Sequence, residues 1–276
     1  MSYQKQSDLY LEDNISKYPA IELLCKMGYK YISPEECVKQ RGSLYNVILK
    51  DTLRERLHNL NRYEYGGSVY KFTAENIEKA ITDLDEPLTD GLVRTSEKIY
   101  DALMLGKSYV ESLPDGTQKS FNLKYIDWDN IDNNVFHITE EYACESMDKQ
   151  HNARPDIVLF VNGIPFAVIE CKAPTISENQ AISQMIRNQG KDYIPQLFKF
   201  AQIVMATNKN AAQYATCGTG EKFWSVWREQ DTEFIDKILS YAVVDRTEQR
   251  GNDHYYGNSL QTRCQLRPSH CQPVRR

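Results

Sequence analysis

Two short apolar runs, Ile157–Val161 and residues 166–169, flank the turn dipeptide Asn162-Gly163. Both runs are rich in β-branched and aromatic residues, and an Asn-Gly pair between two such runs predicts a β-hairpin. Neither run alternates apolar with polar positions. Both faces of each strand are therefore expected to be buried, as in the centre of an α/β sheet.

The chain before this hairpin carries apolar residues mainly at helical spacing. Helices are predicted over residues 8–28, 45–61, 74–84 and 92–105. Strands are predicted over residues 29–32, 109–113, 120–126 and 135–142. Pro19 is expected to break or start the first helix, and Ser33-Pro34 is typical of a further helix start.

The chain after the hairpin continues the mixed pattern. Ser177 with Gln180 three residues later resembles a capping box, so a helix is predicted over 177–188. A buried strand and a short helix should follow, over 200–207 and 232–245. We expect three regions: a mainly helical N-terminal region (residues 1–90), an α/β core (residues 91–245) and an irregular basic tail (residues 246–276).

Composition places the chain among globular proteins, with 41% hydrophobic and 11% aromatic residues in 276. No apolar run approaches the ~20 residues of a membrane span, and the first residues do not resemble a signal peptide. The seven cysteines are scattered and contain no C-x-x-C pair. We therefore expect a cytoplasmic protein with reduced thiols, no membrane association and no structural zinc.

The formal net charge is −5, although residues 246–276 carry six Arg against two acidic residues. An acidic protein is poorly suited to bind DNA alone, because neutralisation of phosphates dominates such affinity. If the chain acts on DNA, it needs a local basic patch or partner subunits that hold the DNA, and we favour partners.

Three ionisable residues interrupt the buried hairpin: Asp156, Glu170 and Lys172. Charges rarely occupy buried strands unless they are paired or bind a metal. Glu170 and Lys172 are two positions apart and project from the same face. Two carboxylates beside one ammonium suit a hard cation. The simpler interpretation is a buried salt bridge, but it leaves one carboxylate uncompensated, which is costly.

Pairing in the hairpin decides whether this site exists. A plain two-residue Asn162-Gly163 loop would place Asp156 opposite Ile169, with the two carboxylates on opposite faces of the sheet. A shared site requires Asp156 to lie opposite Glu170. We therefore predict a three-residue or bulged loop, with Gly163 at positive φ.

The order Pro155-Asp156, thirteen intervening residues, then Glu170-Cys171-Lys172 resembles the PD-(D/E)xK nuclease signature. The wider phrase RPDIVLFVNGIPFAVIECKAP resembles the N-terminal nuclease domain of the R subunit (HsdR) of type I restriction–modification enzymes, over roughly residues 8–245. The resemblance implies an α/β restriction-endonuclease-like core, in which helices flank a central mixed sheet. It also implies a Mg²⁺-dependent DNA endonuclease, with Mn²⁺ as a substitute.

The resemblance assigns roles to individual residues. Asp156, Glu170 and the Cys171 carbonyl would bind the metal, and Lys172 would either deprotonate water or stabilise charge. Gln184 matches the Gln of a family Gln-x-x-x-Tyr motif, in which Asn188 stands where the Tyr belongs. An upstream acid is also expected, and the candidates for it are Glu97 and Glu12.

The family continues into an ATP-driven translocase, but this sequence contains no G-x-x-x-x-G-K-[ST] loop. ATP is therefore expected to serve only the full-length family, and the chain is expected to be a nuclease-domain fragment. DNA and the methyltransferase (M) and specificity (S) subunits are the implied partners. The alternatives are a non-catalytic docking module for those subunits, or another nuclease family with the same signature.

Overall fold

The structure is a computed structural model that describes residues 12–228. The helix predicted over 232–245 and the basic tail predicted over 246–276 lie outside the described residues. Within residues 12–228, no helix is long and apolar enough to cross a membrane, and none of the five cysteines forms a disulfide.

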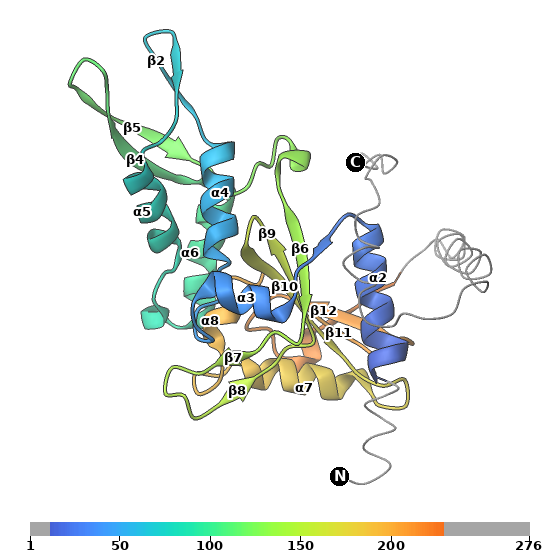
Figure 1. Ribbon diagram of the computed structural model, residues 1–276. Helices are drawn as coiled ribbons and strands as arrows, with labels where there is room; N and C mark the ends of the chain where they lie inside the picture. Colours follow the sequence, from blue (N-terminus) through green and yellow to red (C-terminus); the bar gives the residue numbers. More distant parts are fainter. Residues whose placement is uncertain (1–11, 229–276) are drawn as a thin grey trace, which may run out of the picture.

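A seven-stranded mixed sheet forms the centre of the protein (Figure 1). In spatial order its strands are β1 (Lys30–Tyr31), β6 (Phe136–Glu140), β9 (Ile157–Val161), β10 (Ile164–Cys171), β11 (Ile203–Thr207), β12 (Ala212–Ala215) and β13 (Ser225–Val226). Strands β9 and β10 are antiparallel, whereas β10 and β11 are parallel. The predicted restriction-endonuclease-like α/β core is confirmed.

Two hairpins and a small pair of strands lie outside this sheet. They are β2 (Tyr63–Tyr65) with β3 (Ser68–Tyr70), β4 (Lys107–Ser112) with β5 (Gln118–Leu123), and β7 (Cys144–Glu145) with β8 (Asn152–Ala153). The helical segments are η1 (Glu12–Lys17), α2 (Tyr18–Lys26), α3 (Pro34–Arg41), α4 (Lys50–Leu60), α5 (Ala74–Leu84), η2 (Leu88–Asp90), α6 (Leu92–Leu105), η3 (Ile131–Asn133), α7 (Glu178–Asn188), α8 (Pro195–Phe198) and η4 (Glu221–Phe223).

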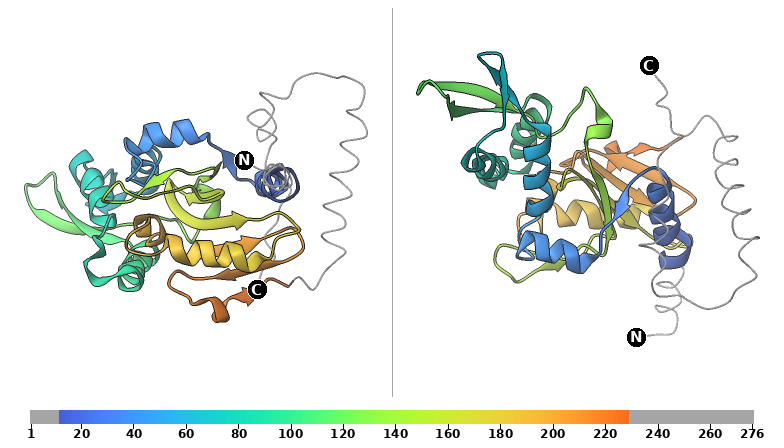
Figure 2. Two further views of the ribbon diagram at one scale, coloured as in Figure 1. Left: turned by 90° about the horizontal axis from the view of Figure 1, so that it is seen from below. Right: turned by 45° about the horizontal axis from the view of Figure 1, so that its top comes forward.

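Each face of the sheet is covered by different helices. Val158, Phe160 and Val168 belong to a large core that includes residues of α3 to α8. Ile157 and Ile169, on the other face, pack with Ile21 of α2. Helix α2 accordingly stands apart from the other helices in Figures 1 and 2. Burial on both faces makes β9 and β10 fully enclosed central strands, as their apolar runs predict.

Several predicted elements match the structure closely, and others require correction. The helices predicted over 74–84 and 92–105 are α5 and α6. The helix predicted from residue 45 begins only at Lys50, because the preceding loop is held by Arg41, whose guanidinium donates to the Asn46 carbonyl (3.1 Å). The helical interpretation of the first third also missed the β2–β3 hairpin. Its turn, Gly66-Gly67, has positive φ at both residues.

The central hairpin corrects the predicted turn while supporting the pairing that the site needs. Ile164 pairs with Val161, so Asn162-Gly163 is a plain two-residue turn, and the predicted three-residue or bulged loop is wrong. Both turn residues have positive φ, 53° and 84°, as a type I′ turn requires. A bulge at Phe166 then shifts the register, so that Ile169 faces Ile157.

The turn is anchored by its surroundings. The Asn162 side chain accepts a hydrogen bond from the Val135 amide (2.9 Å) and donates to the Tyr125 carbonyl (2.9 Å). The Leu49 amide donates to the Gly163 carbonyl (2.9 Å), and a Cβ at Gly163 would lie 2.6 Å from the Leu49 carbonyl oxygen. Only glycine fits at this position.

The N-terminal region contributes to the same sheet. Strand β1 pairs in parallel with β6, so a segment of the region predicted to be mainly helical forms one edge of the sheet in the predicted core. Helix α2 separates β1 from η1, and η1 lies at the end of the sheet where β10 terminates, because Ser16 donates to the Lys172 carbonyl. The position of η1 matters for the site described next.

Candidate active site

The register shift brings the two predicted carboxylates together. With Ile169 opposite Ile157 as the last pair of the ladder, Glu170 and Asp156 are the next residues of the two strands and lie on the same side of the sheet. Asp156 immediately precedes β9, and its Oδ2 accepts a hydrogen bond from the Cys171 amide (2.7 Å). Both carboxylates are buried, with 9% of Asp156 and 1% of Glu170 exposed. They lie on the face of the sheet that α7 covers.

Lys172 joins the carboxylates from the end of β10. Its Nζ lies 3.1 Å from Glu170 Oε1 and donates to the Cys171 carbonyl (2.9 Å). The Ser16 hydroxyl of η1 donates to the Lys172 carbonyl (2.8 Å), which ties η1 to the end of the strand. The predicted same-face arrangement of Glu170 and Lys172 is therefore present.

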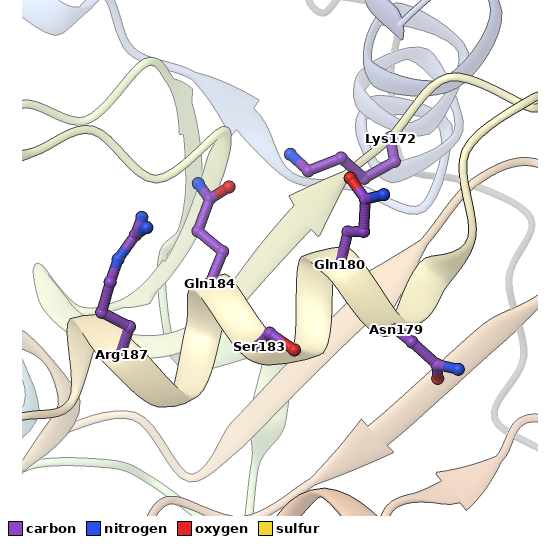
Figure 3. A pocket seen from close by; sticks show the side chains of 6 residues that line it. All are labelled: Lys172, Asn179, Gln180, Ser183, Gln184 and Arg187. Carbon is purple, nitrogen blue, oxygen red and sulfur yellow. The ribbon is translucent and has the colours of Figure 1, made fainter.

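Helix α7 supplies a neutral partner for Glu170. The Gln184 amide donates to Glu170 Oε1, so Gln184 points into the site and is not an ordinary surface residue (Figure 3). Asn188, one turn further along α7, is 2% exposed, and its Oδ1 finds no hydrogen-bond partner among residues 12–228. Ser177 caps α7 as predicted, although its hydroxyl accepts from Asn179 and not from a residue further along.

Of the two candidate upstream acids, Glu12 lies at the site. Its Oε1 is 3.8 Å from Lys172 Nζ, and its side chain is 17% exposed. Glu97 lies on α6 and is exposed to solvent, and its charge adds to the rise in the pKa of Cys217 that burial causes. In Figure 1, α6 lies across the sheet from α2. The sequence favoured Glu97, and the geometry favours Glu12.

The buried ion pair between Lys17 and Glu141, next to the backbone of Asp156, is not predicted from the sequence. Lys17 is 4% exposed, and its Nζ lies 2.5 Å from a carboxylate oxygen of Glu141 and 2.6 Å from one of Asp13. The Glu141 amide donates to the Asp156 carbonyl (2.9 Å), which fixes the backbone of Asp156. Lys17 and Glu141 are far apart in the chain, so no local pattern signals their contact.

Burial and crowding of carboxylates raise the pKa values in this cluster. Burial, followed by the charge of Asp156, raises the pKa of Glu170 to about 8. Burial also raises the pKa of Asp156 and of Glu12, against the opposing charge of Lys172. Burial alone would lower the pKa of Lys172, but the surrounding carboxylates outweigh it and raise that pKa. The cluster therefore holds more carboxyl groups than the single ammonium of Lys172 can compensate, and Glu170 keeps its proton up to about pH 8.

The donor set fits a small, hard divalent cation. Glu170 Oε2 is buried and accepts no hydrogen bond within residues 12–228. The same stretch of chain contains no group of three or more His, Cys, Asp or Glu arranged to hold a metal. Two carboxylates and the Cys171 carbonyl are a small set of oxygen donors. Mg²⁺ suits such a set, because it keeps several waters and binds one or two carboxylates.

An open depression of about 550 Å³ lies beside the cluster, over the exposed side of α7. Lys172 and Gln184, which contact Glu170, also line it (Figure 3). The buried carboxylates are thus next to a surface that a large ligand can reach.

Comparison with known proteins shows the family to which this sequence is similar. The family model described as Type I restriction enzyme R protein N terminus matches residues 9–223. The chain is 28% identical over 246 residues to a candidate type I restriction enzyme endonuclease subunit, MjaIXP, of Methanocaldococcus jannaschii, covering 84% of this chain and 22% of that protein.

Two further relatives come from bacteria. The EcoprrI type I restriction enzyme endonuclease subunit of Escherichia coli is 26% identical, over 89% of this chain and 66% of that protein. The HindI endonuclease subunit of Haemophilus influenzae is 25% identical, over 80% of this chain and 21% of that protein. The chain thus spans only part of the length of the relatives that it matches.

Proposed function

The chain belongs to the family of type I restriction enzyme R protein N termini, and we propose that it carries a Mg²⁺-dependent endonuclease site that hydrolyses phosphodiester bonds in DNA. The observation that carries this proposal is the convergence of Asp156, Glu170 and Lys172 beside an open surface. Mn²⁺ is expected to substitute for Mg²⁺.

Asp156, Glu170 and the Cys171 carbonyl would hold the cation, which when bound neutralises phosphate charge and lowers the pKa of a coordinated water. The protein's own contribution is positional. The Cys171 amide orients Asp156 through Oδ2, and Gln184 holds Glu170 through Oε1. Glu170 Oε2 is left as an acceptor without a protein partner among residues 12–228.

For Lys172 we propose stabilisation of negative charge on the phosphate, in preference to the role of general base. Its Nζ donates to Glu170 Oε1 and to the Cys171 carbonyl, and both contacts favour the ammonium form. A fixed ammonium beside the reacting phosphate stabilises charge that develops during hydrolysis. A general base would need the neutral amine, which these acceptors disfavour.

The relatives are named as subunits of type I restriction enzymes. We infer by analogy that this chain works in the cytoplasm with methyltransferase and specificity subunits, which would supply the DNA affinity that its acidity limits. A non-catalytic docking module for those subunits is the second candidate function. Asn188 favours that alternative, because it replaces the Tyr of the expected motif and its Oδ1 is buried without a partner in residues 12–228.

Nicking of supercoiled plasmid tests the proposal. The wild-type chain with Mn²⁺ at low salt should nick slowly and without sequence preference, and added ATP should not change the rate. Lys172→Ala should abolish nicking yet keep the rise in Tm that the cation causes, because Lys172 is not a ligand. Lys119→Ala, which removes an exposed lysine from β5, is the matched control and should nick like the wild type.

Two outcomes would contradict the proposal. Equal nicking by the wild type and Lys172→Ala would identify a contaminating nuclease. Absence of nicking by either protein, together with a cation-induced rise in Tm for both, would favour the docking module.

A further inference from the structure

One side of α7 presents a row of polar side chains that the proposed chemistry does not fully use. Gln180, Gln184 and Arg187 are spaced by four and three residues, so they lie on one face of the helix. Figure 3 shows all three pointing to the side on which Lys172 lies. Gln184 is engaged by Glu170, whereas Arg187 has no comparable carboxylate contact within residues 12–228.

The depression along this row contains no acidic residue among the described side chains that line it. Its lining is Lys172, Asn179, Gln180, Ser183, Gln184 and Arg187, which are two cations and four neutral hydrogen-bonding side chains. The chain as a whole is acidic, with a net charge of −5. Because Lys172 is already paired with Glu170, Arg187 is the cation among these described lining residues that is left to bind an anion.

Arg187 is exposed and available to such an anion. Within residues 12–228 its guanidinium forms no ion pair; it lies over the Tyr193 ring, 5.6 Å from the ring centroid. Contact with a ring face orients a guanidinium while leaving its N–H groups to bind other acceptors. A guanidinium held in this way suits the bidentate recognition of a phosphate.

We propose that a DNA strand lies along α7, and that Arg187 binds the phosphate next to the one hydrolysed. Three residues of helix separate Gln184 from Arg187, about 4.5 Å along the axis. Arg187 lies on the same face of α7 as Gln184, which contacts Glu170, so a strand that places one phosphate at Lys172 runs past Arg187 with a neighbouring phosphate. This inference rests on the proposed function, and it assigns to Arg187 a positioning role for the substrate.

DNA binding in Ca²⁺, measured by fluorescence anisotropy with a labelled duplex over a range of salt concentrations, tests this inference without requiring hydrolysis. Arg187→Ala should weaken binding and make the slope of log K against log salt less steep by about 0.9, the loss of one phosphate contact. Arg187→Lys should retain most of the slope. Lys119→Ala is the matched control, because Lys119 also lies 5.6 Å from a ring centroid but sits in the β4–β5 hairpin, away from α7 (Figure 1).

The outcomes separate this inference from the proposed function. If Arg187→Ala binds with the wild-type slope, or reduces it no more than Lys119→Ala does, the inference is wrong. The same holds if the wild type shows no salt-dependent binding. If Arg187→Ala makes the slope of log K against log salt less steep but the wild type nicks no plasmid, DNA binding along α7 stands and the proposed hydrolysis fails. An unchanged Tm for Arg187→Ala is expected, because the residue is exposed.

Discussion

Ionisation of Glu170 should destabilise the protein when no divalent cation is present. Burial and the charge of Asp156 raise the pKa of Glu170 from 4.5 to about 8 in the folded state. Between these pH values the folded protein retains a proton that the unfolded chain has lost. The stabilising effect of that proton is complete below pH 4.5 and is lost as the pH rises toward 8.

The expected magnitude follows from the size of this shift. At 1.36 kcal/mol per pH unit, the shift from 4.5 to about 8 corresponds to a loss on the order of a few kcal/mol, which Glu170 shares with Asp156. A domain is typically stable by only about 5–15 kcal/mol, so the effect should be large in urea unfolding. In EDTA, the free energy of unfolding should fall by several kcal/mol between about pH 5 and pH 8.

Glu170→Gln isolates the contribution of this carboxyl group. The variant keeps an acceptor for Gln184 and Lys172 but cannot ionise, so its free energy of unfolding should lose most of the decline with pH. Glu75→Gln removes an exposed acid from α5 and should keep the wild-type profile. If wild type and Glu170→Gln show the same pH dependence, the buried carboxylate does not carry the cost that the structure implies.

Magnesium should offset part of the decline in the wild-type free energy of unfolding. A cation that binds only the folded state stabilises it by about 2.7 kcal/mol at a concentration of one hundred times Kd. Because the cation binds ionised carboxylates, its stabilising effect should be greatest at about pH 8 and small at about pH 5. A Mg²⁺ effect that does not depend on pH would place the cation elsewhere on the protein.

Three further predictions concern other parts of the site and its support. Asp156→Asn should remove the Mg²⁺-induced rise in Tm and should leave the cation-free variant at least as stable as the cation-free wild type. A large loss of stability would mean that Asp156 has a structural role. Gly163→Ala should lower the free energy of unfolding in urea by more than about 2 kcal/mol, since φ is 84° and the Leu49 carbonyl oxygen lies 2.6 Å from the added Cβ. The matched control Gly116→Ala has φ 83° and no atom within 4 Å of the added Cβ, so it should lower that free energy by only about 1–2 kcal/mol. Ser16→Ala removes the hydrogen bond to the Lys172 carbonyl and should cost about 1 kcal/mol by the same measurement; an unchanged stability would mean that η1 is not held there.

The register of the hairpin shows what the sequence could and could not determine. A shared carboxylate site required Asp156 to lie opposite Glu170, which was inferred correctly, but the irregularity was placed in the turn. It lies at Phe166, next to Pro165. Proline has no N–H to donate to a ladder and marks bulges within strands. Pro165 is therefore the sequence signal that places the irregularity in β10 and not in the loop.

Glu12 illustrates a contact that no local pattern contains. Glu97 lies on a helix closer in sequence to β9 and β10, and the bounds predicted for that helix, α6, are correct. Glu12 reaches the site only because η1 lies at the end of β10, where Ser16 bonds to the Lys172 carbonyl. Contacts of this kind depend on tertiary packing, so local sequence patterns predict the elements but not which of them meet.

The charge balance of the cluster also bears on the choice between a nuclease and a docking module. Three carboxylates, of Glu12, Asp156 and Glu170, face the ammonium of Lys172. The neighbouring cation Lys17 is already paired with Asp13 and Glu141. Leaving a buried charge uncompensated costs about 3–5 kcal/mol, and an apolar replacement of such a cluster is often more stable. A docking module that binds no cation would bear the energetic cost of these buried carboxyl groups without compensation. A bound cation compensates their charge directly. The surplus of carboxyl groups over ammonium groups is therefore an argument for cation binding that does not rest on the family, because without a cation Glu170 keeps its proton up to about pH 8.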